Sequence, residues 1–305
     1  MLAATYGFTP LFLESENALW PLMEVNSRLT GKRGVSLPFT DNCEPLGADK
    51  KSFGEIFLAA VELGKKRRWK YLEGRGGKSF LENAATSISF YGHTVELNGE
   101  EAKMFAAMDG SMRRAIRKAE KEGVTVEISQ SEPAMRDFFY LQCLTRKRHG
   151  LPPQSLEFFL NIQKFVLAQN LGFVAVASHQ GRKIAASVYF FLGGRAIYKY
   201  GASDFMHQDL RGSNLVMWTA MCRLAEMGMS TLHLGKTSLE HDGLRRFKLN
   251  LGAKEEILDY FRYDFSRCQF VTDKDSVAGW HNRVFSTLPL PLSRLAGRLL
   301  YKHWA

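Results

Sequence analysis

Apolar and polar positions follow two different periods along the first 130 residues. Residues 52–65 have apolar residues at helical spacing, which predicts a helix with one apolar face made of Phe53, Ile56, Phe57 and Ala60. Short apolar runs predict strands over 8–13, 35–39 and 69–72. The runs 86–91 and 94–97, joined around Gly92, predict either a hairpin or two strands that meet at a bend.

The pattern then becomes helical before it returns to a strand. Helices are expected over 100–108 and 111–121, the second ending before Gly123, which suits a residue just past a helix end. A strand over 124–128 follows. We place a domain boundary near residue 130, after this strand.

The second half has a more regular pattern. Helices over 131–148 and 155–169 are separated by a Gly-Leu-Pro-Pro breaker, and the next three strands are expected over 172–178, 183–192 and 195–202. A strongly apolar helix over 213–226, a strand over 231–234, a helix over 242–250 and a strand over 256–265 complete the order. This order predicts an α/β fold with mixed sheets. The expected units are 1–130, 131–270 and a basic amphipathic tail over 271–305.

Composition narrows the class of protein. The chain has 305 residues, of which 45% are hydrophobic and 24% charged, as in folded proteins. The four scattered cysteines predict neither a disulfide framework nor a thiolate metal site, and we expect no metal and no required cofactor. The apolar runs 184–194 and 212–222 are too short to span a bilayer and are expected to be a buried strand and a buried helix. With no secretory signal pattern, we expect a cytoplasmic protein.

A formal net charge of +10 favours anionic partners. Basic residues gather in the run 65–70 and on the helix that carries Arg113, Arg117 and Lys121. Such runs are either solvated faces or sites for a polyanion such as tRNA or a lipid-linked pyrophosphate. The segment 292–304 combines Leu292, Leu295 and Leu299 with basic residues, so it either lies in a membrane interface or docks on the protein's own core.

A strand followed by a helix start between residues 198 and 214 has the parts of an anion site. Backbone N–H groups at a helix N-terminus, with an arginine nearby, favour phosphate. The alternative is an ordinary loop in which Ser213 or Asn214 caps the helix. The candidate binding residues of this segment are Lys199, Arg211, Gly212, Ser213 and Asn214.

The most distinctive stretch is Leu234–Ala253. It contains Gly235-Lys236-Thr237 at the end of a strand, then Gly243-Leu244-x-x-Phe247-Lys248-x-x-x-Gly252. With Gly34-Val35-Ser36-Leu37-Pro38-Phe39-Thr40-Asp41, Arg113-x-x-x-Arg117, Arg146-x-x-x-Gly150 and Tyr200-Gly201-Ala202-Ser203, it resembles the FemAB-like branch of the GNAT acyltransferase superfamily. The resemblance extends over roughly residues 30 to 265.

This resemblance implies two GNAT-like subdomains and an N-acyltransferase. Better-known members of the branch transfer an amino acid from aminoacyl-tRNA to the amine of a cell-wall precursor, and relatives use acyl-CoA donors. It also implies that substrate or phosphate contacts the segment that contains Lys236, Arg245, Arg246, Phe247 and Lys248, and that a bulged strand over 195–202 supplies N–H groups to an oxyanion.

Two positions depart from the acyl-CoA pattern. Ordinary GNAT enzymes have Gln/Arg-x-x-Gly-x-Gly/Ala at the helix start, whereas here Arg211 stands three residues after Gln208. Arg211 therefore either blocks close approach of a CoA pyrophosphate or binds a phosphate placed farther out. His233 stands at a strand position where an acid is common, either as a half-buried structural histidine or as a base.

The sequence shows no metal-binding histidine pair, Walker loop or Ser/His/Asp order. Tyr198 and Tyr200, two residues apart, are expected to project in the same direction. The candidate catalytic residues are Tyr200, Asp204, His207 and His241.

We therefore expect an aminoacyltransferase acting on an anionic, amine-bearing acceptor, in the bacterial cytoplasm or peripherally on the inner membrane face. The alternatives are an acyl-CoA-dependent N-acyltransferase for an amino acid or amino sugar, and a non-catalytic tRNA- or polyanion-binding protein.

Overall fold

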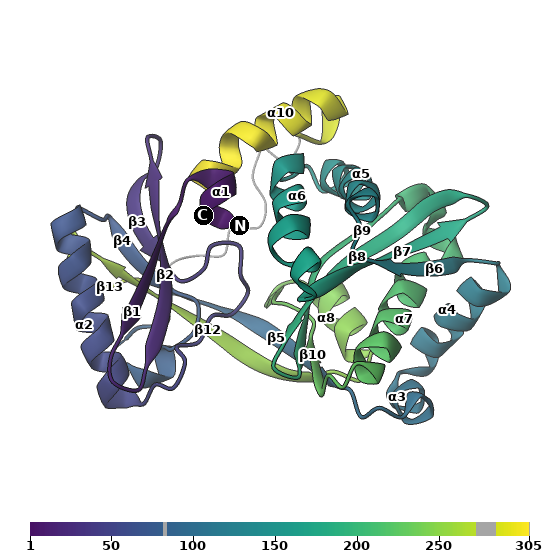
Figure 1. Cartoon of the computed structure of the whole chain (residues 1–305), viewed down its shortest axis with the longest axis horizontal. Helices are drawn as coiled ribbons and strands as arrows, with labels where there is room; N and C mark the ends of the chain where they lie inside the picture. Colours follow the sequence, from purple (N-terminus) through teal and green to yellow (C-terminus); the bar gives the residue numbers. More distant parts are fainter. Residues whose placement is uncertain (82–83, 273–284, 305) are drawn as a thin grey trace.

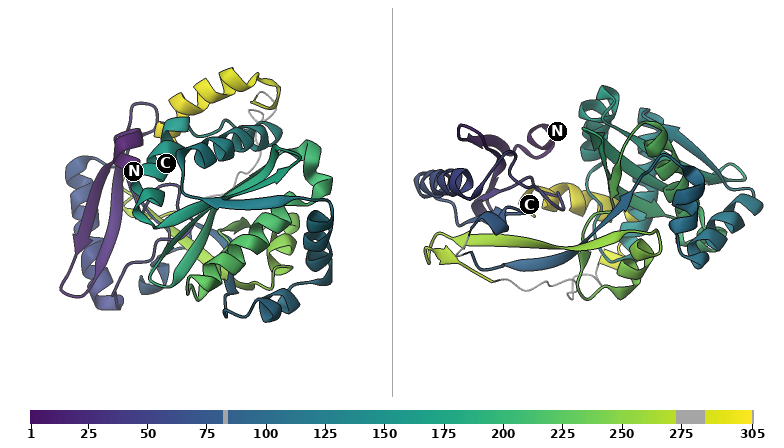
Figure 2. Two further views of the ribbon diagram at one scale, coloured as in Figure 1. Left: turned by 45° about the vertical axis from the view of Figure 1, so that its right-hand side comes forward. Right: turned by 90° about the horizontal axis from the view of Figure 1, so that it is seen from below.

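The computed structural model describes residues 1–81, 84–272 and 285–304. Figure 1 shows two lobes joined by a long pair of strands, with the chain ends close together between the lobes. Figure 2 shows the same arrangement from two further directions, and the joining strands are clearest in its right-hand view.

The first lobe is built on helix α2, Lys50–Arg67. Its start is fixed by a capping box, in which the Asp49 side chain accepts from the Ser52 backbone N–H and the Ser52 hydroxyl bonds back to Asp49. The helix buries the predicted apolar face against Trp20 and Phe261, so the expected helix is confirmed. The other elements of this lobe are α1 (Leu2–Tyr6), β1 (Thr9–Glu14), β2 (Leu19–Ser27), β3 (Gly31–Val35), β4 (Tyr71–Gly74) and η1 (Lys78–Phe80).

The sequence pattern left one strand of this lobe unpredicted and placed the end of another wrongly. Strand β2 was not predicted: Pro21 lies inside it, and its buried positions 22–25 are consecutive instead of alternating. The strand predicted over 35–39 ends at Val35. Leu37 and Phe39 have positive φ angles of 44° and 63°, which turn residues 36–42 into a loop.

A long antiparallel pair joins the lobes. Strand β12 (Lys254–Asp264) pairs with β5 (Ile88–Glu96) along its first part and with β4 beyond Tyr260, and β13 (Gln269–Phe270) pairs with its end. Neither alternative predicted around Gly92, a hairpin or two strands that meet at a bend, is correct, since β5 is one continuous strand. A side chain at residue 92 would come within 2.9 Å of Leu258, so glycine allows β12 to pack closely rather than making a turn.

The second lobe confirms the predicted order of elements. Its helices are α3 (Glu101–Ala107), α4 (Gly110–Lys121), α5 (Glu132–Arg148), α6 (Leu156–Phe165), η2 (Leu167–Gln169), η3 (Phe205–Leu210), α7 (Gly212–Glu226) and α8 (Asp242–Leu249). Its strands are β6 (Thr125–Ser129), β7 (Gly172–His179), β8 (Arg182–Leu192), β9 (Arg195–Ser203), β10 (Thr231–His233) and β11 (Thr237–Ser238).

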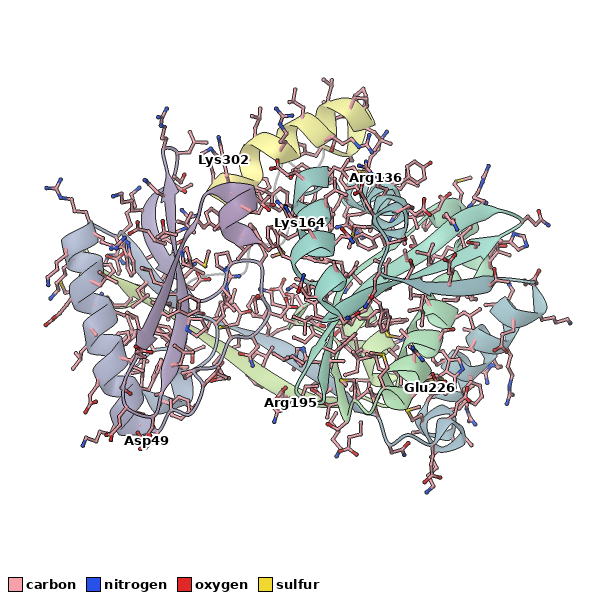
Figure 3. All side chains as sticks on the ribbon, viewed as in Figure 1. Asp49, Arg136, Lys164, Arg195, Glu226 and Lys302 are labelled. Atoms are coloured by element: carbon pink, nitrogen blue, oxygen red, sulfur yellow. The ribbon has the colours of Figure 1, made fainter. Side chains whose placement is uncertain are left out.

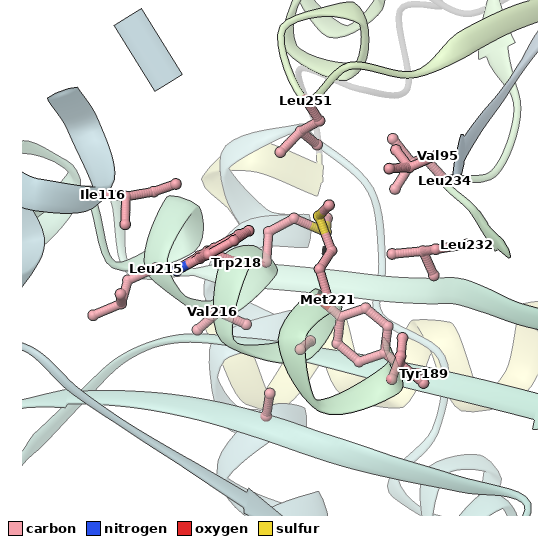
Figure 4. Packing of buried hydrophobic residues seen from close by; sticks show 14 of the residues in the cluster. Val95, Ile116, Tyr189, Leu215, Val216, Trp218, Met221, Leu232, Leu234 and Leu251 are labelled. Carbon is pink, nitrogen blue, oxygen red and sulfur yellow. Dashed lines mark hydrogen bonds between the residues drawn. The ribbon is translucent and has the colours of Figure 1, made fainter. Parts of the chain in front are cut away.

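The sheet is mixed, as predicted. Its strand order among the described residues is β1-β2-β3-β4-β12-β5-β10-β9-β8-β7-β6, with parallel pairs at β3–β4 and β9–β10. In the second lobe, one face of the sheet packs with α4 and α7 around Trp218, Met221 and Tyr189, as Figure 4 shows. The other face packs with α5 and α6 around Phe138, Phe158 and Phe159.

The packing crosses the boundary that the sequence placed near residue 130. Met112 and Ile116 of α4 lie in one apolar cluster with α7, and β5 pairs with β10. The first of the two GNAT-like units therefore does not end as a separate packing body at β6. Strand β5 of the first predicted unit pairs with β10 of the second, and strand β12 of the second pairs with β4 of the first.

Helix α10 (Leu290–Leu300) and η4 (Tyr301–His303) end the described chain and lie along the top of the molecule in Figure 1. The predicted tail 271–305 is described in part, because residues 273–284 and 305 lie outside the described residues. No helix among the described residues is long and apolar enough to cross a membrane.

Candidate active site

Strand β9 carries a bulge at the point where the sequence placed the reactive strand. Tyr198 lies opposite Tyr189, whereas Tyr200 lies opposite the preceding residue, Val188, so Lys199 is the extra residue. The extra residue sends the two tyrosines to opposite faces: Tyr198 packs on the α7 side and Tyr200 on the α5–α6 side. The expectation that they share a face is wrong, because a bulge breaks the alternation of a regular strand.

Strands β9 and β10 separate immediately before this bulge. They pair in parallel from Arg195 to Ile197, opposite Thr231 to His233. The chain then turns at Gly235, whose φ is 75°, and β11 pairs with β5 instead of β9. The separation leaves the bulged backbone of β9 without its neighbour on that side.

A cavity of about 650 Å³ lies beside the separated strands, and we call it the central cavity. Its polar lining comes from five parts of the chain: Asp41 from the 36–42 loop, Thr94 from β5, Arg195 and Lys199 from β9, Thr231 and His233 from β10, and Glu256 from β12. Arg195, which begins β9, is labelled in Figure 3. Phe158, Phe190 and Tyr200 add an apolar wall.

Asp41 and Lys199 form a charged pair in this cavity. The Lys199 Nζ lies 3.9 Å from the Asp41 Oδ2 and donates a hydrogen bond to the Phe39 carbonyl. Burial lowers the pKa of Lys199, and Asp41 opposes that shift. The loop is held in turn by the Tyr260 hydroxyl, which donates to the Asp41 carbonyl. A Cβ on residue 235 would come within 3.0 Å of the Asp41 carboxylate, so Gly235 leaves room for it.

One ring nitrogen of His233 accepts a hydrogen bond, and the other has no hydrogen-bond partner in the described part of the chain. The Gly235 N–H donates to Nδ1 over 3.1 Å, which places the proton of a neutral ring on Nε2. Nε2 is buried, has no hydrogen-bond partner among the described residues, and lies 4.0 Å from the Glu256 carboxylate. Burial lowers the pKa of His233. The neutral ring can therefore donate a hydrogen bond to a carbonyl oxygen.

Lys248 lies behind the same turn. Its ammonium donates to the carbonyls of Gly235 at 2.7 Å and Lys236 at 3.1 Å. Only 3% of this residue is exposed, and burial lowers its pKa to about 8. Lys248 thus fixes the turn between β10 and β11, and its contribution to phosphate binding stays a prediction.

A second, smaller hollow of about 270 Å³ lies at the start of α7, and we call it the α7 pocket. Asp204 and His207 meet there, with Oδ2 and Nδ1 3.0 Å apart. It is also lined by the binding residues predicted in the same segment, namely Arg211, Gly212, Ser213 and Asn214, and by Phe247. The helix start that the sequence identified as a possible anion site therefore lines a pocket beside the end of β9, and its binding of an anion stays a prediction.

The helix start differs from the capped alternative. The N-cap residue is Arg211, not Ser213 or Asn214, and its side chain makes no capping hydrogen bond. Arg211 has φ of 58°, a left-handed conformation that glycine adopts more easily. At Gly212, a Cβ would come within 2.9 Å of Ile184, so the helix lies close to β8.

The remaining predicted residues lie apart from both hollows. His241 caps α8 through Nδ1, which accepts from the Leu244 N–H, and its residue is exposed. Lys236 extends its Nζ over the Phe90 ring at 3.8 Å. Arg245 forms a paired contact with Glu255, 2.8 Å for each hydrogen bond, and Arg246 is exposed. None of these side chains lines the central cavity.

Asp41 and Glu256 were not among the predicted site residues. Asp41 stood in the quoted Gly34–Asp41 motif, and its position in that motif was the available signal. Glu256 had no local signal, because its place is set by the pairing of β12 with β5, in which Glu256 lies opposite Gly92, 164 positions earlier in the sequence.

Residues 107–249 match the family model described as an acetyltransferase (GNAT) domain. Residues 107–249 therefore resemble a GNAT domain. The matched segment includes the bulged strand β9, the α7 pocket, His233 and Lys248, whereas Asp41 and Glu256 lie outside it. No curated protein sequence matches the chain.

Solved structures share the fold over most of the chain. The crystal structure of FemX has a TM-score of 0.68 and 13% identity, covering 87% of this chain and 90% of that one. The C-terminal domain of a putative lysylphosphatidylglycerol synthetase from Agrobacterium fabrum has a TM-score of 0.59 and 16% identity, covering 88% and 87%. A tandem GNAT protein from the clavulanic acid biosynthesis pathway has a TM-score of 0.53 and 9% identity, covering 82% and 81%. The two-unit GNAT fold expected from the sequence is confirmed.

Proposed function

We propose that this protein transfers an aminoacyl group to the amine of an anionic acceptor, such as a cell-wall precursor. One observation carries the proposal: within or beside the segment that matches a GNAT domain, the bulged strand β9 separates from β10 next to a cavity lined by Asp41, Lys199 and His233. The names of the solved structures that share the fold, FemX and lysylphosphatidylglycerol synthetase, accord with an aminoacyl donor.

The cavity contains the groups that amine acylation needs. The acceptor amine attacks the donor carbonyl, a C–N bond forms, and the ester bond to the donor breaks. Asp41 would accept the proton that the amine loses and return it to the departing hydroxyl oxygen. The Nε2–H of His233 and the backbone N–H groups of the bulge would donate to the carbonyl oxygen as it gains negative charge.

Positive charge near the cavity suits an anionic acceptor. Arg195 and Lys199 both line it, and the whole chain carries a net charge of +10. We place the reaction in the bacterial cytoplasm or at the inner face of its membrane, where such acceptors are made.

The proposal and its alternative, an acyl-CoA-dependent N-acyltransferase, differ in the acyl donor. Acyl-CoA transfer is favoured by the α7 pocket, because a helix N-terminus suits a pyrophosphate. Against it, Arg211 occupies the position at which ordinary GNAT enzymes place the first glycine of their phosphate loop. We therefore prefer aminoacyl-tRNA, whose terminal phosphates an arginine can bind without such close backbone approach.

The test compares aminoacyl-tRNA and acetyl-CoA as donors in the same transfer assay. Total bacterial tRNA charged with radiolabelled amino acids, or labelled acetyl-CoA, is incubated with the protein and a cell-wall precursor peptide that bears a free lysine amine. We expect base-stable label on the peptide with charged tRNA and none with acetyl-CoA. Transfer from acetyl-CoA alone would establish the alternative. Binding of tRNA with no transfer from either donor would instead establish a non-catalytic polyanion-binding protein.

A further inference from the structure

Helix α10 packs on the protein through two small residues and the tyrosine that follows the helix. Ser293, Gly297 and Tyr301 are buried, and a Cβ on residue 297 would overlap the Pro153 carbonyl oxygen. The Tyr301 hydroxyl donates to the Pro152 carbonyl over 3.2 Å, and the Arg294 guanidinium lies 4.8 Å from the centre of the Phe139 ring. The residues at 293, 297 and 301 follow each other at four-residue spacing, so they form the docked side of the helix.

The leucines of α10 point the other way. Leu292, Leu295 and Leu299 share one face and are 52%, 49% and 51% exposed. An amphipathic helix that belonged only to the core would bury this face. In the described part of the chain this face is instead exposed to solvent, and we call its three leucines the outer leucine stripe.

Further apolar and basic groups surround the stripe. Arg298, Lys302 and Trp304 are exposed on the same terminal segment, and Lys302 is labelled in Figure 3. His303 ties this segment to the β2–β3 turn: its Nδ1 lies 2.8 Å from the Ser27 hydroxyl, and its carbonyl accepts from Arg33. The turn carries the exposed Arg28 and Leu29 and projects on the same side of the molecule as α10 (Figure 1).

We propose that the outer leucine stripe, with Trp304 and the flanking Arg298 and Lys302, binds the surface of an anionic lipid bilayer. Leucine and tryptophan side chains enter the boundary between headgroups and acyl chains, while arginine and lysine contact lipid phosphates. A second copy of this chain would instead bring another set of cations against the first, on a molecule that already carries +10.

This surface is close to the central cavity. The Tyr301 ring on the docked side of the segment contacts Phe39, with ring centroids 5.8 Å apart, and Phe39 lines the cavity. Met1 and Leu2, at the start of α1, line the same cavity. A bilayer bound at α10 would thus lie near a wall of the site. The inference concerns binding alone and does not depend on the proposed reaction.

The test measures binding of the full chain to vesicles without substrate. We expect flotation with vesicles of phosphatidylcholine containing about 30 mol% phosphatidylglycerol, at least tenfold weaker binding to pure phosphatidylcholine, and a loss of binding as salt screens the charges. Replacing the stripe together, by Leu292→Ser, Leu295→Ser and Leu299→Ser, should weaken binding at least about tenfold. Arg298→Gln with Lys302→Gln should weaken it about fivefold for each cation.

Two control variants replace the same kinds of exposed residue, three leucines or two cations, at positions outside α10 and η4. Leu46→Ser, Leu58→Ser and Leu192→Ser change three leucines that are 61%, 65% and 75% exposed, and Arg114→Gln with Lys118→Gln removes two exposed cations of α4. Both controls should bind vesicles as the unchanged protein does. Equal loss in stripe and control variants, or no binding of the unchanged protein to anionic vesicles, would overturn the proposal. So would a dimer in sedimentation velocity that the stripe variant abolishes.

Should the stripe variant fail to fold, as judged by circular dichroism, the emission of Trp304 supplies a second readout. The unchanged protein should show a blue shift in tryptophan fluorescence when anionic vesicles are added, and Trp304→Phe should remove most of that shift. A shift that persists in Trp304→Phe would count against binding through this segment.

Discussion

The central cavity and the α7 pocket adjoin the same strand, β9, yet they are assembled differently. Asp41, Lys199, His233 and Glu256 reach the cavity from four separate elements. The α7 pocket takes most of its lining from the single stretch 203–214, which includes the Asp204–His207 pair. One site is therefore made by the sheet as a whole, and the other by a local turn.

Their electrostatics differ in a corresponding way. Burial lowers the pKa of Lys199 in the cavity and of Lys248 behind it toward neutral pH, and it lowers the pKa of His233, which favours the neutral ring. The α7 pocket instead offers a helix N-terminus and the guanidinium of Arg211. We therefore propose proton transfer in the cavity and anion binding in the pocket, although the catalytic candidates Asp204 and His207 from the sequence lie in the pocket.

The sharpest test of this division compares two carboxylates. Asp41→Asn should lower turnover about 10²- to 10³-fold, because general base catalysis contributes that much, whereas Asp204→Asn should lower it less than about tenfold. Steady-state kinetics with charged tRNA would measure both, with melting temperatures to verify folding. If Asp204→Asn had the larger effect on turnover, the chemistry would belong to the α7 pocket.

The next test concerns the buried ammonium behind the cavity. The folded-state pKa of Lys248, about 8, lies below its ordinary value of 10.5, so the unfolded chain holds this proton more tightly. The cost of burying the charge is fully present below pH 8 and disappears as pH rises from about 8 to 10.5. The free energy of unfolding of the unchanged protein should therefore gain about 3 kcal/mol over this range relative to Lys248→Met.

Urea denaturation of both proteins at pH 7 and pH 10 measures this difference, and other alkaline titrations cancel between them. Lys248→Arg serves as the control, because it keeps a charge that does not titrate in this range. Parallel pH dependence in the unchanged protein and Lys248→Met would contradict the buried ammonium. A fall in turnover much larger than the change in stability would support the predicted binding of phosphate by Lys248.

The smallest expected effect lies in the α7 pocket. We expect the unchanged protein to bind acetyl-CoA no more tightly than about 1 mM, and Arg211→Gly to strengthen that binding about three- to tenfold, because glycine suits the left-handed φ and removes the side chain. Isothermal titration calorimetry measures both constants. Arg211→Lys, which keeps a cation, should remain weak. Micromolar binding by the unchanged protein would show that the α7 pocket binds CoA, and it would favour acyl-CoA over aminoacyl-tRNA as the donor.

Local signals predicted most of the second lobe. The apolar helix that became α7, the glycine after α4 and the strands β7 to β9 follow from periodicity and turn residues, which act over a few positions. Errors came where distant segments decide the geometry. Gly92 had the signature of a turn but allows β12 to approach closely. For α10 the sequence left two alternatives open, and only its packing showed that Leu292, Leu295 and Leu299 are exposed.

The sequence by itself determined the α/β order and the loop that forms the α7 pocket, because both rest on neighbouring residues, and the resemblance placed the bulged strand over 195–202. Only the tertiary structure decided that Tyr198 and Tyr200 face opposite ways, and that Asp41 meets Lys199 across 158 positions of the chain. A bulge changes the direction of side chains without changing the composition of its strand. A cavity between paired strands depends on which strands become neighbours, and no local pattern specifies that choice.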